Sequence, residues 1–186
     1  MRRLVVLLFL VCILIPAISA QTANQEGELD PIVQSFIRNF ARASLQTKIQ
    51  ILHDSRGIEN VDMGPLYEKA LKFILDNQDL LTSDAMMQQL AILSVRLIGI
   101  SEYSGATFQL WDLFQVYNDA SARIAIMNSL GEVAEGNQRI IARMNDWLDT
   151  QNALFQTGKK PDYQVLGECI TSLGKLGNES SFSLIF

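Results

Sequence analysis

Histidine and cysteine are both scarce in this sequence of 186 residues. His53 is the only histidine, and Cys12 and Cys169 are the only cysteines. One histidine cannot supply a histidine-based metal site or a histidine dyad within one chain. The sequence also lacks HExxH, CxxC, glycine-rich phosphate loops and dinucleotide fingerprints. We therefore expect no cofactor and no metal site.

Positive charge is in short supply as well. The chain has 15 lysines and arginines against 20 aspartates and glutamates, and its formal net charge is −5. An acidic balance disfavours nucleic acid and anionic membranes as partners, since both attract basic surfaces. A protein partner fits this charge better.

The N-terminus has the three parts of a secretory signal peptide. Arg2 and Arg3 form a basic start, an apolar run extends from Leu4 to Ile15, and small residues end at Ala20. Twelve apolar residues rise only about 18 Å as a helix, less than the roughly 30 Å that a spanning helix must cross. We interpret 1–20 as a signal peptide cleaved after Ala20, followed by a polar linker over 21–29. The alternative is an uncleaved signal anchor.

Removal of residues 1–20 would change the composition of what remains. It takes away Arg2 and Arg3 and no acid, so the formal net charge becomes −7. It also removes Cys12, which leaves Cys169 without a partner for an internal disulfide. Cys169 is then either a small buried hydrophobic residue or a reactive thiol, and burial is the favoured interpretation. We expect a periplasmic or extracellular protein with no stable membrane span.

No segment alternates polar and apolar residues for long enough to predict a sheet, whereas helical spacing is widespread. Three segments end in an apolar residue and a glycine, at Gly99, Gly131 and Gly174. A second glycine follows each, at Gly105, Gly136 and Gly177. The pattern predicts a helix ending at each first glycine, a turn, and then a second helix. Glycine suits a left-handed helix cap, and the Asn after Gly136 and Gly177 can cap the next helix.

The first glycines are 32 and then 43 residues apart, and an insertion at 150–160 accounts for the difference. Apolar stripes support both helices of each pair, for example Ile126, Leu130 and Val133 in one helix. Another stripe, which we expect to face the core, is Leu90, Leu93, Leu97 and Ile100. We predict an all-α fold, a solenoid of stacked antiparallel helical hairpins over 30–186. It begins with a cap helix at 30–43, which is followed by repeats at about 46–77, 83–117, 119–150 and 161–186. Inside the first repeat, Pro65 marks the start of a helix.

The segment Ile170–Asn178, which reads ITSLGKLGN, resembles the ALGxLGD core of HEAT repeats. The resemblance includes the subgroup first described in phycobilisome lyases, and it extends from about Gln46 to the C-terminus. It implies an armadillo-like α-solenoid of about four HEAT-like repeats, the last of them incomplete. The sequence departs from the pattern at Gly99-Ile100 and Gly131-Glu132, where the turns are longer.

The insertion at 150–160 is the best candidate for a partner-binding site. Insertions in repeat proteins often lie on the binding face. This one carries Leu154 and Phe155 beside Lys159 and Lys160 on an otherwise acidic protein. The alternative is a longer second helix with an ordinary loop, in which Leu154 and Phe155 simply pack.

Three functions remain open at this point. The leading hypothesis is an exported HEAT-repeat scaffold or adaptor that binds another protein and is not an enzyme; the polar helix positions Gln109, Asp112, Arg139 and Arg143 suit such a partner. The second is an enzyme or enzyme subunit of the lyase type that the resemblance implies, with Cys169 the only candidate nucleophile. The third is a truncated remnant of a longer repeat protein, since the final predicted helix, from about Ser180, is short and apolar.

Trp111 and Trp147 are expected to pack in the core rather than stack on a ligand.

Overall fold

A computed structural model describes residues 29–185 of the chain. The predicted signal peptide, its cleavage after Ala20 and most of the predicted linker lie outside these residues. The chain divides into two units, Met1–Pro31 and Ile32–Phe186, and the packing described below is that of the second. Within residues 29–185 there are nine α-helices and two 3₁₀ helices, and no strand. The predicted all-α class is confirmed.

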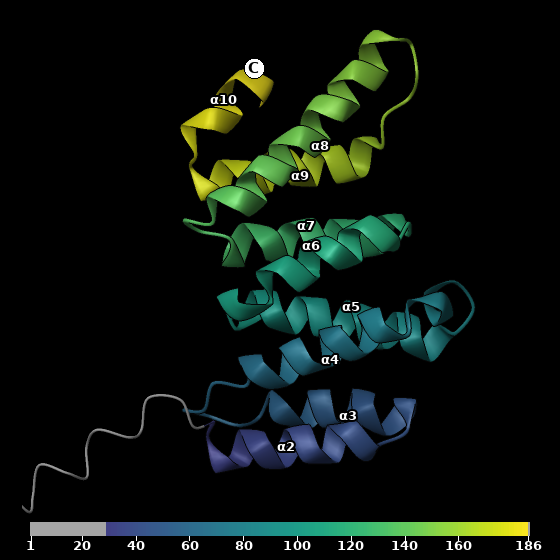
Figure 1. The fold of residues 1–186 in the computed structure, drawn as a ribbon, viewed down its shortest axis with the longest axis vertical. Helices are drawn as coiled ribbons and strands as arrows, with labels where there is room; N and C mark the ends of the chain where they lie inside the picture. The colour runs from purple at the N-terminus through teal and green to yellow at the C-terminus, as the bar shows by residue number, and fades with distance from the viewer. Residues whose placement is uncertain (1–28, 186) are drawn as a thin grey trace, which may run out of the picture. The chain divides into compact units, whose positions relative to one another are not determined.

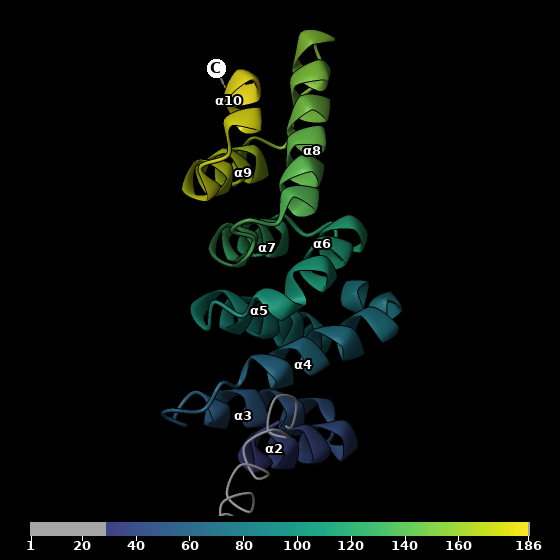
Figure 2. The ribbon, with the colours of Figure 1, turned by 60° about the vertical axis from the view of Figure 1, so that its left-hand side comes forward.

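In chain order the elements are α2 (Pro31–Arg42), α3 (Leu45–Ser55), α4 (Gly64–Asp76), η1 (Gln78–Thr82), α5 (Ala85–Ile100), η2 (Ser104–Ala106), α6 (Thr107–Val116), α7 (Ala120–Val133), α8 (Gln138–Gln156), α9 (Tyr163–Leu176) and α10 (Glu179–Ile185). From α3 onward, α-helices whose numbers differ by two pack on one another. α5 lies between α3 and α7, and α7 lies between α5 and α9. In the same way α6 lies between α4 and α8, and α10 packs on α8. Figure 1 shows α5, α7 and α9 behind α4, α6 and α8, and Figure 2 shows them to the left of those helices.

Polar side chains fix where several helices begin. The side chains of Ser44, Asp84, Asp119 and Asp162 each accept a hydrogen bond from a backbone N–H in the first turn of the following helix. These bonds satisfy N–H groups that have no partner inside the helix. Pro65 lies at the start of α4, as predicted, where its missing N–H has no cost.

Two of the predicted glycine turns are confirmed. Gly136 has φ +71°, and the next residue, Asn137, caps α8 by accepting a hydrogen bond from the N–H of Ile140. Gly177 ends α9 in the left-handed conformation with φ +61°. Side chains other than glycine are disfavoured at these angles, so the turn itself favours glycine.

The prediction that helices end at Gly99, Gly131 and Gly174 is wrong. Each glycine lies inside its helix, since α5, α7 and α9 continue to Ile100, Val133 and Leu176. A Cβ added at Gly99 would lie 2.8 Å from the Oγ of Ser129 on α7, and one at Gly131 would lie 2.9 Å from the Cβ of Ser172 on α9. These two glycines therefore allow the backbones of neighbouring helices to approach closely.

An aromatic cluster joins α6 to its neighbours. Trp111 stacks on Phe114 with ring centroids 5.2 Å apart, and Trp147 of α8 meets Phe114 edge-on at 5.4 Å. Arg123 of α7 places its guanidinium 4.2 Å from the Phe114 centroid and 5.6 Å from that of Trp147. Both tryptophans pack in the core as predicted, and a cation links three helices.

At the other end of this unit, Lys48 is buried between α2, α3 and α4. Its Nζ donates to the backbone carbonyls of Phe40 and Ala43, the latter at 2.9 Å. The ammonium also lies 4.7 Å from the ring centroids of both Phe40 and Phe73. A buried lysine needs such partners, and here they are carbonyls at the C-terminal end of α2.

Candidate binding surfaces

Cys169 is the candidate nucleophile of the sequence, and it is fully buried in α9. Burial raises the pKa of its thiol to about 12, and its one hydrogen-bond contact is to the carbonyl of Met144 at 3.9 Å. A thiol with this pKa carries almost no thiolate at neutral pH, and thiolate is the reactive form. The expectation that Cys169 is a small buried residue is confirmed.

No group of three or more His, Cys, Asp or Glu side chains in residues 29–185 is placed to hold a metal ion. His53 is exposed on α3. In the same part of the chain, no helix has both the length and the apolar character needed to cross a membrane.

The segment 150–160 is the end of a helix and a loop. Leu154 and Phe155 lie in the last turn of α8, which runs to Gln156, and Lys159 and Lys160 lie in the exposed loop that follows. This backbone is the longer second helix of the alternative interpretation. Its side chains differ from that alternative: Leu154 is half-buried, whereas Phe155 is 64% exposed. The structure therefore keeps Phe155 and the two lysines available on one end of α8.

The loop after α8 is tied back by its own hydrogen bonds. The N–H of Lys159 donates to the carbonyl of Leu154 at 3.0 Å, and Gly158 takes the left-handed conformation. The side chain of Gln151, which is buried, accepts a hydrogen bond from the N–H of Asp162 at 3.4 Å. The loop therefore turns the chain from α8 into α9.

Among the residues whose side chains the structure describes, the most exposed large apolar one is Ile100, the last residue of α5. It is 74% exposed, so the expectation that Ile100 faces the core with Leu90 and Leu97 is wrong. At about 100° per residue, Ile100 lies only about 20° around the helix from Leu93, which is half-buried and packs against the core. Neighbouring elements therefore cover this stripe at Leu93 but not at the end of α5.

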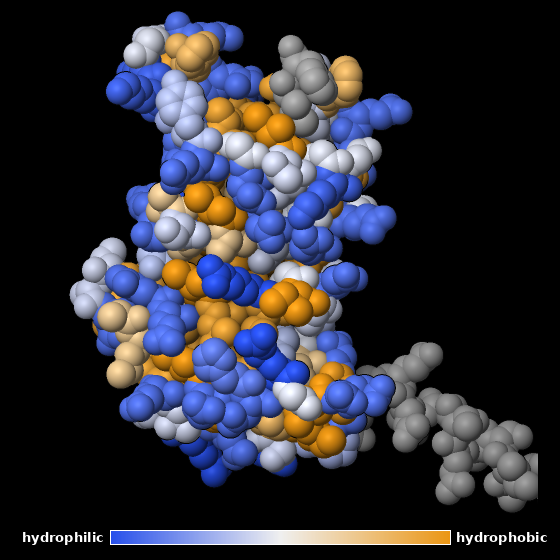
Figure 3. Space-filling view, turned by 180° about the vertical axis from the view of Figure 1, so that it is seen from behind, coloured by the Kyte–Doolittle hydropathy of each residue, from blue (hydrophilic) through white to orange (hydrophobic). Residues whose placement is uncertain are grey.

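Ile100 lies between two hollows. One has a volume of about 540 Å³ and spans α5 and α7; it is lined by Arg96, Gly99, Ile100, Glu102, Ser121, Ile124, Ala125, Asn128, Ser129, Glu132 and Glu168. The other, of about 520 Å³, is lined by Ser55, Arg56, Ile58, Val61, Asp62, Met63, Tyr67, Leu97, Ile100 and Ser101. We name the two hollows with Ile100 the Ile100 surface. Figure 3 shows hydrophobic area in the middle of this face, which the odd-numbered helices form.

Charged side chains border the first hollow, and most of them are acidic. Glu132 pairs with Lys175 of α9 at 2.6 Å, and Glu168 accepts a hydrogen bond from the Asn128 amide at 2.9 Å. Arg96 and Glu102 also line the hollow. Glu102 has φ +52°, a conformation uncommon for residues other than glycine. The hollow, whose lining is part apolar and part polar, therefore has three carboxylates and one guanidinium.

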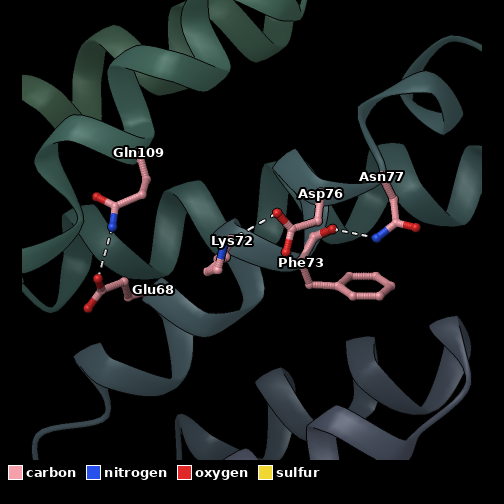
Figure 4. A network of polar contacts seen from close by, with 6 residues as sticks. All are labelled: Glu68, Lys72, Phe73, Asp76, Asn77 and Gln109. Carbon is pink, nitrogen blue, oxygen red and sulfur yellow. Dashed lines mark hydrogen bonds and ion pairs between the residues drawn. The ribbon is translucent and has the colours of Figure 1, made fainter.

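On the other face, Glu68 of α4 accepts a hydrogen bond from the Gln109 amide of α6 at 2.9 Å (Figure 4). It also accepts from the Tyr103 hydroxyl at 2.9 Å. Burial, and then the hydrogen bond to Glu68, raise the pKa of Tyr103 to about 12. Nearby, Lys72 pairs with Asp76 at 3.3 Å. Gln109 was expected to meet a partner protein, but the structure assigns it to an internal hydrogen bond.

The other polar positions proposed for partner contact are more open. Arg139 and Arg143 place their guanidinium groups 5.2 Å and 5.8 Å from the ring centroid of Phe108, which is 38% exposed. Asp112 is exposed on α6. This small cluster has an apolar centre and a basic border, the opposite charge from the Ile100 surface.

Comparison with protein-family models, with curated proteins and with solved structures finds no match to this chain.

Proposed function

We propose that this chain is an exported, non-catalytic α-solenoid of the HEAT type that binds another protein through the Ile100 surface. The observation that carries the proposal is the exposed side chain of Ile100 between two hollows. Exposed apolar area bordered by charge is typical of surfaces that bind other proteins.

The repeated packing of the helices supports the solenoid part of the proposal. Each helix of a solenoid contacts its equivalents in the repeats on either side. Here α7 contacts both α5 and α9, and the two contacts use equivalent residues, Gly99 with Ser129 and Gly131 with Ser172. Gly99 and Gly131 thus have matching roles in successive helix pairs.

The shape and charge of the Ile100 surface indicate what kind of segment it would bind. A side chain that stands between two hollows can insert between two apolar side chains of a partner, which then fill the hollows. Fully burying Ile100 would contribute about 1.5–3 kcal/mol. Glu132 is already paired with Lys175, and the carboxylates of Glu102 and Glu168 favour lysine or arginine next to those apolar residues. The partner we propose is therefore a segment that combines apolar and basic residues.

The enzyme alternative depends on Cys169, since it is the only candidate nucleophile from the sequence. Its complete burial and its raised pKa favour a structural role, and binding is the function that the remaining surface supports better.

Site-specific crosslinking from within the first hollow tests this proposal. A photoreactive amino acid replaces Ser121, which is exposed and lines the hollow, and a matched protein carries it at Asp149, exposed on α8. We expect one protein to be crosslinked from position 121 and not from 149 in cells that produce the chain. We also expect Ile100→Glu to abolish this product. Crosslinks that form equally from both positions, or that persist in Ile100→Glu, would contradict the proposal.

A further inference from the structure

A second surface, away from Ile100, follows from how the odd-numbered helices join. At each of two junctions a serine of the later helix packs on a glycine of the earlier one. The Ser129 hydroxyl donates to the carbonyl of Val95, four residues before Gly99, at 2.9 Å. The Ser172 hydroxyl donates to the carbonyl of Met127, four residues before Gly131, at 2.8 Å. The two junctions share one geometry.

The glycine and the acceptor carbonyl of this junction occur a third time, on α9. Gly174 follows Ser172 by two residues, as Gly131 follows Ser129, and the carbonyl four residues before it belongs to Ile170. Among the described residues nothing lies within 4 Å of the position that a Cβ of Gly174 would take. The receiving positions of α9 are therefore open, whereas those of α5 and α7 are filled by the next helix.

The open side of α9 is a hollow of about 650 Å³ with a largely apolar lining. The lining residues are Ile170, Leu173, Gly174, Gly177, Asn178, Glu179, Ser181 and Phe182. Phe182 of α10 is 66% exposed at its border. The hollow thus combines apolar walls with a glycine that permits close approach.

Ser181 gives an independent indication that a ligand belongs here. Its side chain lines the hollow and only 1% of the residue is exposed, yet its hydroxyl has no hydrogen-bond partner among the described residues. A buried hydroxyl without a partner costs about 1–3 kcal/mol, and native proteins rarely leave one so. A bound molecule with a polar group at this point would satisfy it.

We propose that the hollow on α9 binds an amphipathic α-helix of another protein chain, with a serine at the crossing point. The helix would dock on α9 as α9 docks on α7. Its serine would pack on Gly174 and donate to the carbonyl of Ile170. Its apolar residues would contact Leu173 and Phe182, and a polar group beside them would bond to Ser181. The site continues a row of internal junctions with the same chemistry, which favours a helix over a small molecule. It shares no residue with the Ile100 surface.

The probe is a hydrocarbon-stapled, fluorescent peptide with the α9 sequence, Tyr163–Leu176, which carries the serine of the native junction. Fluorescence anisotropy measures its binding to the protein as exported. We expect saturable binding that Gly174→Leu weakens at least about tenfold, because the new side chain occupies the crossing point. Asp112→Leu is the control, since it adds the same side chain at an exposed position on α6, outside the hollow. It should leave binding unchanged.

Two further variants distinguish binding at this site from nonspecific binding. Replacement of the peptide's own Ser172 by Leu should weaken binding at least about tenfold, since the bulk would prevent the close approach. Ser181→Ala in the protein should weaken it about threefold or more, through loss of one hydrogen bond. No saturable binding, or equal weakening by Gly174→Leu and Asp112→Leu, would overturn the proposal. Neither result bears on Ile100, so failure here is distinguishable from failure of the proposed function.

Discussion

Ser172 of α9 lies against Gly131 of α7 so closely that a Cβ added to the glycine would stand 2.9 Å from the serine Cβ. The serine hydroxyl donates to the carbonyl of Met127 across the same junction. Close backbone approach and a hydrogen bond thus join the two helices at one point. The equivalent pair, Gly99 and Ser129, does the same for α5 and α7.

Gly131→Ala should destabilise the protein, although alanine is the better helix former. In an exposed helix this change adds about 0.5–1 kcal/mol of stability. At Gly131 the added methyl group would overlap Ser172, and we expect a loss of about 1–3 kcal/mol. Gly167→Ala, with open space around it, is the control and should be stabilising. Urea denaturation followed by circular dichroism measures both, and a stabilising Gly131→Ala would refute the close approach.

Arg123→Ala should cost about 1–2 kcal/mol, because the side chain packs on Phe114 and Trp147 and links α7 to α6 and α8. Arg139→Ala, at the exposed ring of Phe108, serves as the comparison and should cost about 0.5 kcal/mol or less. Thermal unfolding followed by tryptophan fluorescence, which reports on Trp147, distinguishes the two. Equal losses would mean that Arg123 is not held between the rings.

Cys169 should be protected from thiol reagents in the folded protein. An exposed thiol becomes mostly thiolate by about pH 9, so its labelling accelerates steeply from neutral pH. A buried thiol with a pKa of about 12 stays protonated over that range, and its labelling should follow unfolding instead. Rapid labelling of the native protein at neutral pH would contradict this burial and would revive the enzyme alternative.

The same thiol should make stability fall at high pH. Its pKa is raised from 9.0 to about 12 in the folded chain, so above pH 9 the unfolded chain releases this proton while the folded chain keeps it. Cys169 should therefore reduce the free energy of unfolding by up to about 1.4 kcal/mol per pH unit above that point. The difference in unfolding free energy between the parent and Cys169→Ala isolates this contribution. A difference that is independent of pH would show that the two states bind this proton equally.

Export with cleavage after Ala20 stays a prediction from the sequence. Mass spectrometry of the protein recovered outside the cytoplasm should find Gln21 as its first residue. Replacing Leu7 and Leu8 by Arg should retain the protein inside the cell, since it interrupts the apolar run. Recovery of the intact N-terminus from a membrane fraction would favour the signal anchor instead.

Much of the fold could be predicted from the sequence, because helical periodicity and turn chemistry are local. The start of α4 at Pro65 and the turn at Gly136 and Asn137 follow from backbone rules that need no neighbour. The role of Gly99 and Gly131 could not be predicted in this way. A glycine that ends a helix and one that admits a neighbouring helix look alike in a single sequence, and only the position of Ser129 or Ser172 separates them.

The candidate site was harder to predict. Ile100 matched the spacing of a buried stripe, and its exposure depends on where along α5 the neighbouring elements cover that stripe. The hollow on α9 was beyond sequence reasoning, because it is defined by an unfilled junction that resembles two filled ones. The exposure of Phe155, in contrast, could be predicted from its neighbours in the sequence, and Phe155 is exposed.

The most direct test of the proposed function is the affinity of Ile100→Glu for the protein that crosslinks at position 121. Isothermal titration calorimetry compares it with the parent and with Phe108→Glu, which places the same charge on an exposed apolar residue of the opposite face. Loss of a central apolar contact of about 2 kcal/mol predicts binding about 30-fold weaker for Ile100→Glu and unchanged for Phe108→Glu. Equal affinity of Ile100→Glu and the parent would contradict the assignment of this surface.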